Sequence, residues 1–282
     1  MAVRNPLGEF LQTRRARISP EQAGLRAGAS GRTRRRVAGL RREELAQLAG
    51  ISVEYYQRLE QGRANRPSRE VLDSLAEVLR LDDTERAYLL RLADPPRNRL
   101  AQNVSTEVRP QLRHMLELVD RVPALVITDS FDVLAANVLA ERLFDPISKV
   151  AQGNGNLART LFLDPAAREF YVEWDEVAAA TVAALRVTAA THPHDRDLTV
   201  LINELSTGSV EFDELWQTGE VAVRTHGSKS FRHPAIGILT LNYENLELPG
   251  DLRQRLVTFS PDPATATSAA LQVLASETYA RN

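Results

Sequence analysis

Residues 40–62, LRREELAQLAGISVEYYQRLEQG, constrain the fold more than any other part of the sequence. They are typical of two short helices separated by a tight turn. Leu45, Ala46 and Ala49 share one face of the first helix, and Tyr56 and Leu59 on the second face back toward it. A small residue at position 46 allows the two helices to cross closely. This is the pattern of a helix-turn-helix.

The residues of the turn agree with this interpretation. Gly50 adopts a positive φ at little cost, Ile51 fills the turn, and the Ser52 hydroxyl suits the N-cap of the second helix. A helical hairpin without a DNA-binding role is the alternative. Six coordinated positions at fixed spacing favour DNA binding over it.

Composition limits the classes of protein to consider. A chain of 282 residues is long enough for two domains, and the lack of cysteine excludes disulfides, thiolate zinc sites and cysteine nucleophiles. The sequence has no apolar run near the roughly 20 residues of a membrane span. The first residues are too charged for a signal peptide. We therefore expect a soluble cytoplasmic protein without a membrane partner.

The net charge of −2 conceals an asymmetry along the chain. Residues 1–100 contain 20 Arg, no Lys and 13 acidic residues, a charge of +7, and the remainder contains 15 basic and 24 acidic residues, a charge of −9. A basic part is expected of a protein that binds the phosphate backbone. A basic surface kept for solubility is the alternative, but it does not explain why the excess coincides with the helix-turn-helix.

Five helices are expected before residue 95. The first begins at Asn5-Pro6, the motif supplies two near 41–49 and 52–61, Ser68 caps a fourth, and Asp82 with Glu85 forms a capping box for a fifth. Pro95-Pro96 ends this part. The sequence thus predicts an all-α, five-helix, lambda-repressor-like domain at 1–94 and a linker at 95–107.

Residues 108–282 are predicted to form an α+β domain with an antiparallel sheet. A helix at Leu112–Val122 precedes a strand pair at 124–129 and 133–137. Helices follow between 138 and 217. Further strands lie within 229–248, with a tight turn at Ile236-Gly237, and at 256–262. A last helix is expected at 264–276.

The second helix of such a motif places its N-terminal residues at base edges in the major groove. Arg58 can bind guanine or a phosphate, Glu54 can accept from cytosine, Val53 can contact a thymine methyl, and Gln57 either pairs with adenine or faces solvent. Ser52 opens this helix. Phosphate contacts are expected from four arginines that flank the two helices, each of which is otherwise a solvated surface residue: Arg41, Arg42, Arg63 and Arg66.

The basic run from Arg32 to Arg36 permits two interpretations. It enters the minor groove or contacts phosphate, as basic arms do, or it forms a loop on the side away from DNA.

Several segments resemble bacterial MmyB-like transcription regulators. EELAQLAGIS and LEQG are hallmarks of the XRE (Cro/C1-repressor-like) helix-turn-helix family, and PALVITDSFDVLAANVLAERLF, NLARTLFLDPAAREFY and KSFRHPAIGILTLNYENLELP resemble the second part of the MmyB-like proteins. The resemblance implies a DNA-binding regulator with a PAS-like second domain that senses a small molecule, with a fatty acid as a suggested ligand. Ala136 stands where the family usually has Trp.

A PAS-like sheet covered by helices often leaves an apolar site between the two layers. Each candidate for its lining is otherwise a plain core residue, and His233 is otherwise bonded to the backbone. Lys229 or Arg232 suits an acyl carboxylate. The candidates are Ile127, Phe131, Leu134, Asn137, Phe144, Phe162, Trp174, Lys229, Arg232 and His233.

Three hypotheses follow for the whole chain. The first is a ligand-responsive regulator that binds an operator in double-stranded DNA as a homodimer, with no cofactor beyond a small apolar or fatty-acyl effector. The second is an enzyme with a DNA-binding part, which the lack of any catalytic motif disfavours. The third is a regulator whose second domain binds a protein partner or dimerises.

The His192-Pro193-His194-Asp195 segment is interpreted as a polar loop rather than a metal site, with Asp195 as a helix cap.

Overall fold

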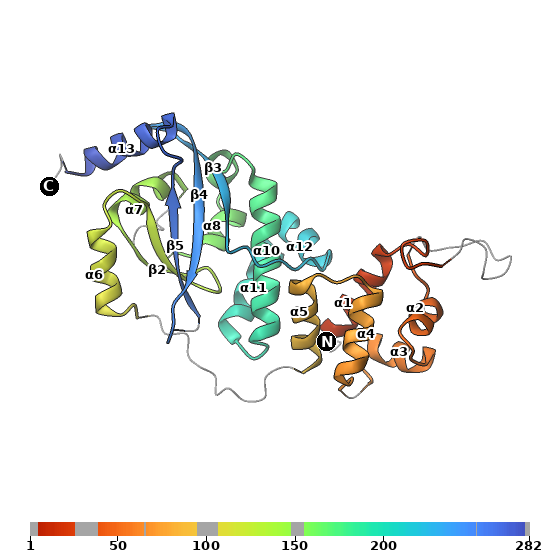
Figure 1. Cartoon of the computed structure of the whole chain (residues 1–282). Helices are drawn as coiled ribbons and strands as arrows, with labels where there is room; N and C mark the ends of the chain where they lie inside the picture. The colour runs from red at the N-terminus through yellow and green to blue at the C-terminus, as the bar shows by residue number, and fades with distance from the viewer. Residues whose placement is uncertain are drawn as a thin grey trace. The chain divides into compact units, whose positions relative to one another are not determined.

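The structure, a computed structural model, describes residues 5–25, 39–64, 66–94, 107–147, 155–251 and 253–279, with side chains to residue 276. The chain forms two compact units (Figure 1). The first comprises residues 1–97 together with Thr218–Ala222, and the second comprises 98–217 with 223–282. The Arg32 to Arg36 run and most of the linker expected at 95–107 lie outside the described residues.

The described residues of the first unit form five helices, as the sequence predicted. Asn5, Ser52, Ser68 and Asp82 each accept a backbone N–H at a helix N-terminus, and Asp82 and Glu85 complete the capping box. These caps are local in sequence, and so the helix starts follow the predicted positions. The helices are α1 (Pro6–Arg17), α2 (Arg42–Leu48), α3 (Val53–Glu60), α4 (Arg69–Val78) and α5 (Asp83–Ala93).

The turn between α2 and α3 has the expected geometry. Gly50 has a φ of +68°, and the Ser52 hydroxyl accepts from the Tyr55 N–H at 3.1 Å. Ala46 of α2 is fully buried, and so are Tyr56 and Leu59 on the inward face of α3. The motif therefore has an apolar face that fixes α3 against the rest of the unit.

Arg14 is an unexpected member of the core of the first unit. Its side chain is 2% exposed, lies over the Phe10 ring and pairs with Glu85 at 2.8 Å. It also donates to the Gly219 carbonyl at 3.0 Å, within the segment Thr218–Ala222 of the same unit. Sequence reasoning did not foresee that a segment so distant along the chain belongs to this unit.

The second unit is built on a five-stranded antiparallel sheet in the order β2-β1-β5-β4-β3 (Figure 1). Its first two strands form the predicted pair, and the last three follow the helices, so the expected α+β class is confirmed. The register places Leu125 opposite Val257 and Tyr243 opposite Phe259. The strands are β1 (Ala124–Thr128), β2 (Val133–Ala136), β3 (His226–His233), β4 (Gly237–Glu247) and β5 (Gln254–Ser260).

Helices cover both faces of this sheet. Helix α6 packs on one face through Leu112 and Leu116, and the other, inner face carries the main core, where Phe144 contacts Phe231 and Phe259. A second apolar cluster joins α8, α10, α11 and α12. The helices are α6 (Pro110–Leu118), α7 (Val138–Phe144), α8 (Leu157–Leu163), α9 (Ala166–Phe170), α10 (Trp174–Thr191), α11 (Arg196–Gly208), α12 (Val210–Gln217) and α13 (Ala266–Tyr279), with a short 3-10 turn at Asp145–Ile147.

Several element boundaries differ by a few residues from the expected positions, and two of these differences have a clear local cause. Helix α6 ends at Leu118 rather than Val122, because the chain becomes extended at Val119 and the buried Asn137 amide donates to the Val119 and Val122 carbonyls. The turn between β3 and β4 spans 234–236, just before Gly237, whose φ is +78°. Neither difference alters the topology.

The helices that the structure describes include none long and apolar enough to cross a membrane.

Replacement of Gly50 tests the backbone requirement of the turn. No atom lies within 4 Å of a Cβ built at this position, so the cost of Gly50→Ala comes from the positive φ alone. We expect Gly50→Ala to lower the free energy of unfolding by about 1–2 kcal/mol. Gly50→Asn should cost less, because Asn tolerates this conformation. Urea unfolding of the full-length protein measures both, and equal stability of the Ala variant and the wild type would contradict the argument.

Candidate functional site

Helix α3 presents a polar face opposite its buried one. Glu54, Gln57 and Arg58 are exposed and Val53 is half-buried, whereas Tyr56 and Leu59 are buried. The Arg58 guanidinium lies 5.7 Å from the centre of the Tyr55 ring. These exposed side chains are those that a helix in the major groove uses to contact base edges.

A buried carboxylate holds α3 in place. The Glu60 side chain is fully buried and accepts from Arg15 of α1 at 2.8 Å and from Arg42 of α2 at 2.5 Å. Asn5 donates to its backbone carbonyl at 2.9 Å. Three helices therefore meet at one residue. Sequence reasoning missed Glu60, although its position four residues after Tyr56, on the buried side of α3, was a usable signal.

The four arginines proposed for phosphate contact differ in their surroundings. Arg63 is exposed, and no ion pair is found for it among the described residues. Arg66 is exposed and pairs with Asp94 at 3.3 Å. Arg41 is half-buried, and its backbone N–H donates to Glu44. Arg42 is 45% exposed but pairs with Glu60, so it has a structural role besides any contact with DNA.

The ligand candidates of the second unit separate into groups. Ile127, Phe144 and Trp174 are buried in the inner-face core, and Phe131 and Phe162 are half-buried against both that core and the second apolar cluster. These five lie in one region of the unit. Phe144 is buried and contacts the rings of Phe170, Phe231 and Phe259, as expected for a plain core residue.

The other candidates are placed differently. Leu134 packs with α6 on the opposite face of the sheet, and the Asn137 side chain caps α7 and binds the chain around residue 120. Arg232 is exposed, and the His233 ring bonds the Arg142 carbonyl and the Ala235 N–H. Lys229 and Arg232 lie on opposite faces of β3, and Lys229 is on the inner face with Phe231.

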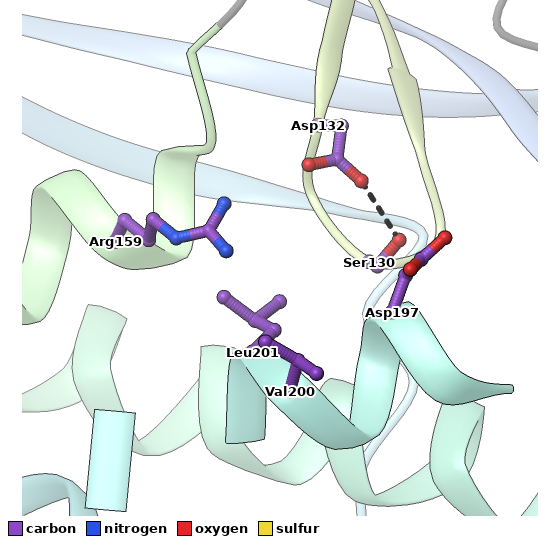
Figure 2. Close-up of a pocket in the computed structure, with 6 residues that line it drawn as sticks. All are labelled: Ser130, Asp132, Arg159, Asp197, Val200 and Leu201. Carbon is purple, nitrogen blue, oxygen red and sulfur yellow. Dashed lines mark hydrogen bonds between the residues drawn. The ribbon is translucent and has the colours of Figure 1, made fainter. Parts of the chain in front are cut away.

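A pocket of about 340 Å³ opens elsewhere in the second unit (Figure 2). Figure 2 shows Arg159 extending from α8 toward Asp132, which lies just before β2. None of the ten sequence candidates lines it. The lining residues are Ser130, Asp132, Arg159, Asp197, Val200 and Leu201.

Three polar side chains of this pocket, those of Ser130, Asp132 and Arg159, already have partners. Asp132 accepts from Thr128 and Ser130 at 3.0 Å and from Asn156 at 2.8 Å, and Arg159 pairs with Glu204 at 2.8 Å. These bonds fix the turn between β1 and β2. The pocket is thus a polar surface depression suited to a small hydrophilic molecule. Its residues come from separate segments of the chain that only folding brings together, so the sequence carried no signal for it.

Beside this turn, Asp129 forms a closed charged network. Arg253 binds it at 2.8 Å and His192 at 3.2 Å, and Arg253 also binds Asp195 at 2.6 Å. Burial alone would raise the pKa of Asp129, but the hydrogen bonds from His192 and Arg253 lower it overall. Asp195 caps α11, as predicted, and no group of metal-ligating side chains occurs among the described residues.

Two family models match the chain. A helix-turn-helix domain matches residues 6–89, and the MmyB-like transcription regulator ligand binding domain matches residues 108–274, which is more than half of the chain. The chain belongs to the MmyB-like transcription regulators. Comparison with curated proteins found no match.

The family match agrees with the two units of the structure. An MmyB-like regulator pairs a DNA-binding helix-turn-helix with a ligand-binding domain, and the two matches fall on the helical part and on the sheet-containing part. Both are domains of a DNA-binding transcription regulator rather than of an enzyme. The resemblance inferred from the sequence is confirmed.

The Glu60 contacts generate a stability prediction for this regulator. Glu60→Gln keeps the size of the side chain but removes the charge that Arg15 and Arg42 bind, and we expect it to lower the free energy of unfolding by about 1.5–3 kcal/mol. Glu54→Gln, on the exposed face of the same helix, should change it by less than about 0.5 kcal/mol. Urea unfolding followed by circular dichroism compares the two. Equal effects would mean that the buried carboxylate does not hold the helices.

Proposed function

We propose that the regulator reads an operator in double-stranded DNA through α3, with residues 1–94 as its DNA-binding domain and residues 108–282 as its sensor. The observation that carries this proposal is the exposed polar face of α3 on a helix whose opposite face is fixed by Tyr56, Leu59 and Glu60. A rigid helix can present its side chains to base edges without a large entropic cost.

The chemistry of each exposed residue suggests its partner. Arg58 suits guanine O6 and N7, Glu54 suits the amino group of cytosine, and Val53 suits a thymine methyl. Arg63 and Arg66, in the loop after α3, suit the phosphates on either side. The net charge of +7 over residues 1–100 supports DNA binding by this part of the chain.

One helix-turn-helix contacts few base pairs, and two-fold symmetric dimers commonly bind two half-sites one helical turn apart. We therefore propose a homodimer on an inverted repeat. Selection of binding sites from random duplex DNA tests this directly. Enrichment of an inverted repeat supports the proposal, and the absence of any enriched sequence would contradict sequence-selective binding.

For the sensor we propose a small effector that is largely apolar, with a fatty-acyl compound as one member of this class. The ligand-binding family of residues 108–274 and the half-buried rings of Phe131 and Phe162 between two apolar clusters support it. Native mass spectrometry of the protein purified from cells tests this. A stoichiometric small molecule would support the sensor role, and an empty protein would favour a dimerisation or partner-binding domain.

Two arginine variants separate base recognition from phosphate binding. Arg58→Ala should reduce the free-energy difference between the preferred base and the other bases at one operator position by about 1–3 kcal/mol. Arg63→Ala should weaken binding to all sequences alike and reduce the salt slope of log K by about one. Arg63 is used instead of Arg42 because Arg42 also binds Glu60. Binding to selected and scrambled duplexes between about 50 and 300 mM salt (roughly a sixfold range) measures both, and identical behaviour of the variants would refute this division.

A further inference from the structure

A short segment belongs to the first unit although it lies far beyond that unit in the sequence. Thr218–Ala222 follows α12 and precedes β3, which are both elements of the second unit. The segment forms neither helix nor strand, and we call these five residues the strap. The chain therefore passes between the units at both ends of the strap, in addition to the boundary between residues 97 and 98.

The strap approaches α1 closely through its backbone. Arg14 of α1 donates to the Gly219 carbonyl at 3.0 Å. Gly219 is buried with a φ of +71°, and a Cβ built on it would lie 3.2 Å from the hydroxyl oxygen of Thr13 and 3.4 Å from the Thr13 Cβ. Val221 of the strap is also buried. Glycine at position 219 thus suits both the backbone conformation and the close approach to α1.

Two acidic side chains, one from α5 and one from the strap, pair with two arginines of α1. Arg14 binds Glu85 at 2.8 Å, and its Nη2 lies 3.9 Å from the Glu220 carboxylate of the strap. Arg17 pairs with the same two carboxylates. Burial lowers the pKa of Arg14, although Glu85 opposes this, so this charge depends on its partners. The strap supplies part of the negative charge that α1 requires.

Helix α1 is also the helix that positions α3. Arg15 binds the buried Glu60 carboxylate, and Asn5, the N-cap of α1, donates to the Glu60 carbonyl. Withdrawal of the strap would remove the carbonyl acceptor of the buried Arg14. An unsatisfied buried donor is costly, so α1 would have to adjust. Because α1 holds α3, the adjustment would reach the helix that presents side chains to DNA.

Both ends of the strap are anchored in the second unit. It follows Gln217, the last residue of α12, and this helix packs in the second apolar cluster through Phe212, which stacks on Trp216. Beyond the strap, the Asn245 side chain of β4 donates to the Arg224 carbonyl at 2.8 Å. A displacement of α12 or of the start of β3 would therefore displace the strap, because at most a few residues of extended chain separate them.

We propose that the strap couples the second unit to the DNA-binding helices: docked on α1 it keeps α3 in place for DNA, and its withdrawal weakens operator binding. This inference rests on the proposed regulator function and assigns the route by which the second unit changes DNA affinity. The coupling acts in both directions, because a strap that favours DNA binding is itself favoured by bound DNA. Any effector that moves α12 or the start of β3 acts through it.

A disulfide can fix the strap in its docked position, because the chain has no cysteine of its own. In Thr13→Cys/Gly219→Cys the two Cβ atoms would lie 3.4 Å apart, close to the roughly 3.8 Å that is typical of a disulfide. Oxidised glutathione should form the intramolecular bond in the folded full-length protein, and intact mass identifies it. Dithiothreitol should open the bond, so the reduced protein serves as the control for the oxidised one.

Operator affinity and amide hydrogen exchange measure the effect of docking. The oxidised protein should bind the selected operator at least threefold more tightly than the reduced protein, and its α3 amides should exchange at least threefold more slowly. The amides of α6 should exchange alike in both forms. In the wild-type background, Glu220→Gln should weaken operator binding at least threefold. Glu214→Gln, at an exposed position of α12, is the matched control and should change it less than twofold.

A change within α12 tests whether the second unit acts through the strap. Phe212→Leu leaves space in the second apolar cluster, and it should weaken operator binding of the reduced double-cysteine protein at least threefold. It should change binding of the oxidised protein less than twofold. Leu116→Ala, a buried change on α6, should change binding less than twofold in both forms. Circular dichroism establishes that each variant is folded, and Trp216→Leu replaces Phe212→Leu if that variant does not fold.

The outcomes separate the strap from the wider function. Equal operator affinities of the oxidised and reduced proteins would overturn the proposal and retain the regulator. Equal weakening by Phe212→Leu in both forms would also overturn it, because the second unit would then act by another route. If neither form binds DNA selectively, the regulator function fails and the exchange of the α3 amides decides: slower exchange in the oxidised protein retains the strap as a coupling between the units, and equal exchange removes it.

Discussion

The Glu60 carboxylate is the interaction on which the arrangement of the DNA-binding helices depends. A fully buried negative charge requires partners, and it finds them in Arg15 and Arg42, on two other helices. Arg15 also donates to the Leu40 carbonyl at 2.8 Å, so the segment that leads into α2 is held by the same network. The ion pairs that neutralise the Glu60 carboxylate therefore fix the position of α3, and with it the positions of the side chains on its exposed face.

Charged side chains in the interior of the second unit have two kinds of surroundings. Around Asp129 the protein supplies every partner itself, through Arg253, His192 and a link to Asp195, and this network ties β1 to the start of α11. On the inner face of the sheet, the half-buried Lys229 and Arg255 lie over the rings of Tyr243 and Phe131, and Asp129 and Glu247 act on Arg255 without forming an ion pair with it. Positions where a protein leaves an ordinary rule of folding unsatisfied tend to be functional. The contrast within one unit shows that its charged side chains are paired completely around Asp129 and incompletely on the inner face.

Local rules sufficed to predict much of the fold. The starts of α3, α4, α5 and α11 follow from Ser52, Ser68, Asp82 and Asp195, because an N-cap acts within three residues of itself. The pairing of distant side chains could not be predicted in this way. The Glu60 contacts, the pocket lined by Asp132 and Arg159, and the placement of Arg255 beside Phe131 all depend on packing and strand register, and a one-residue change of register would reverse which face Arg255 occupies.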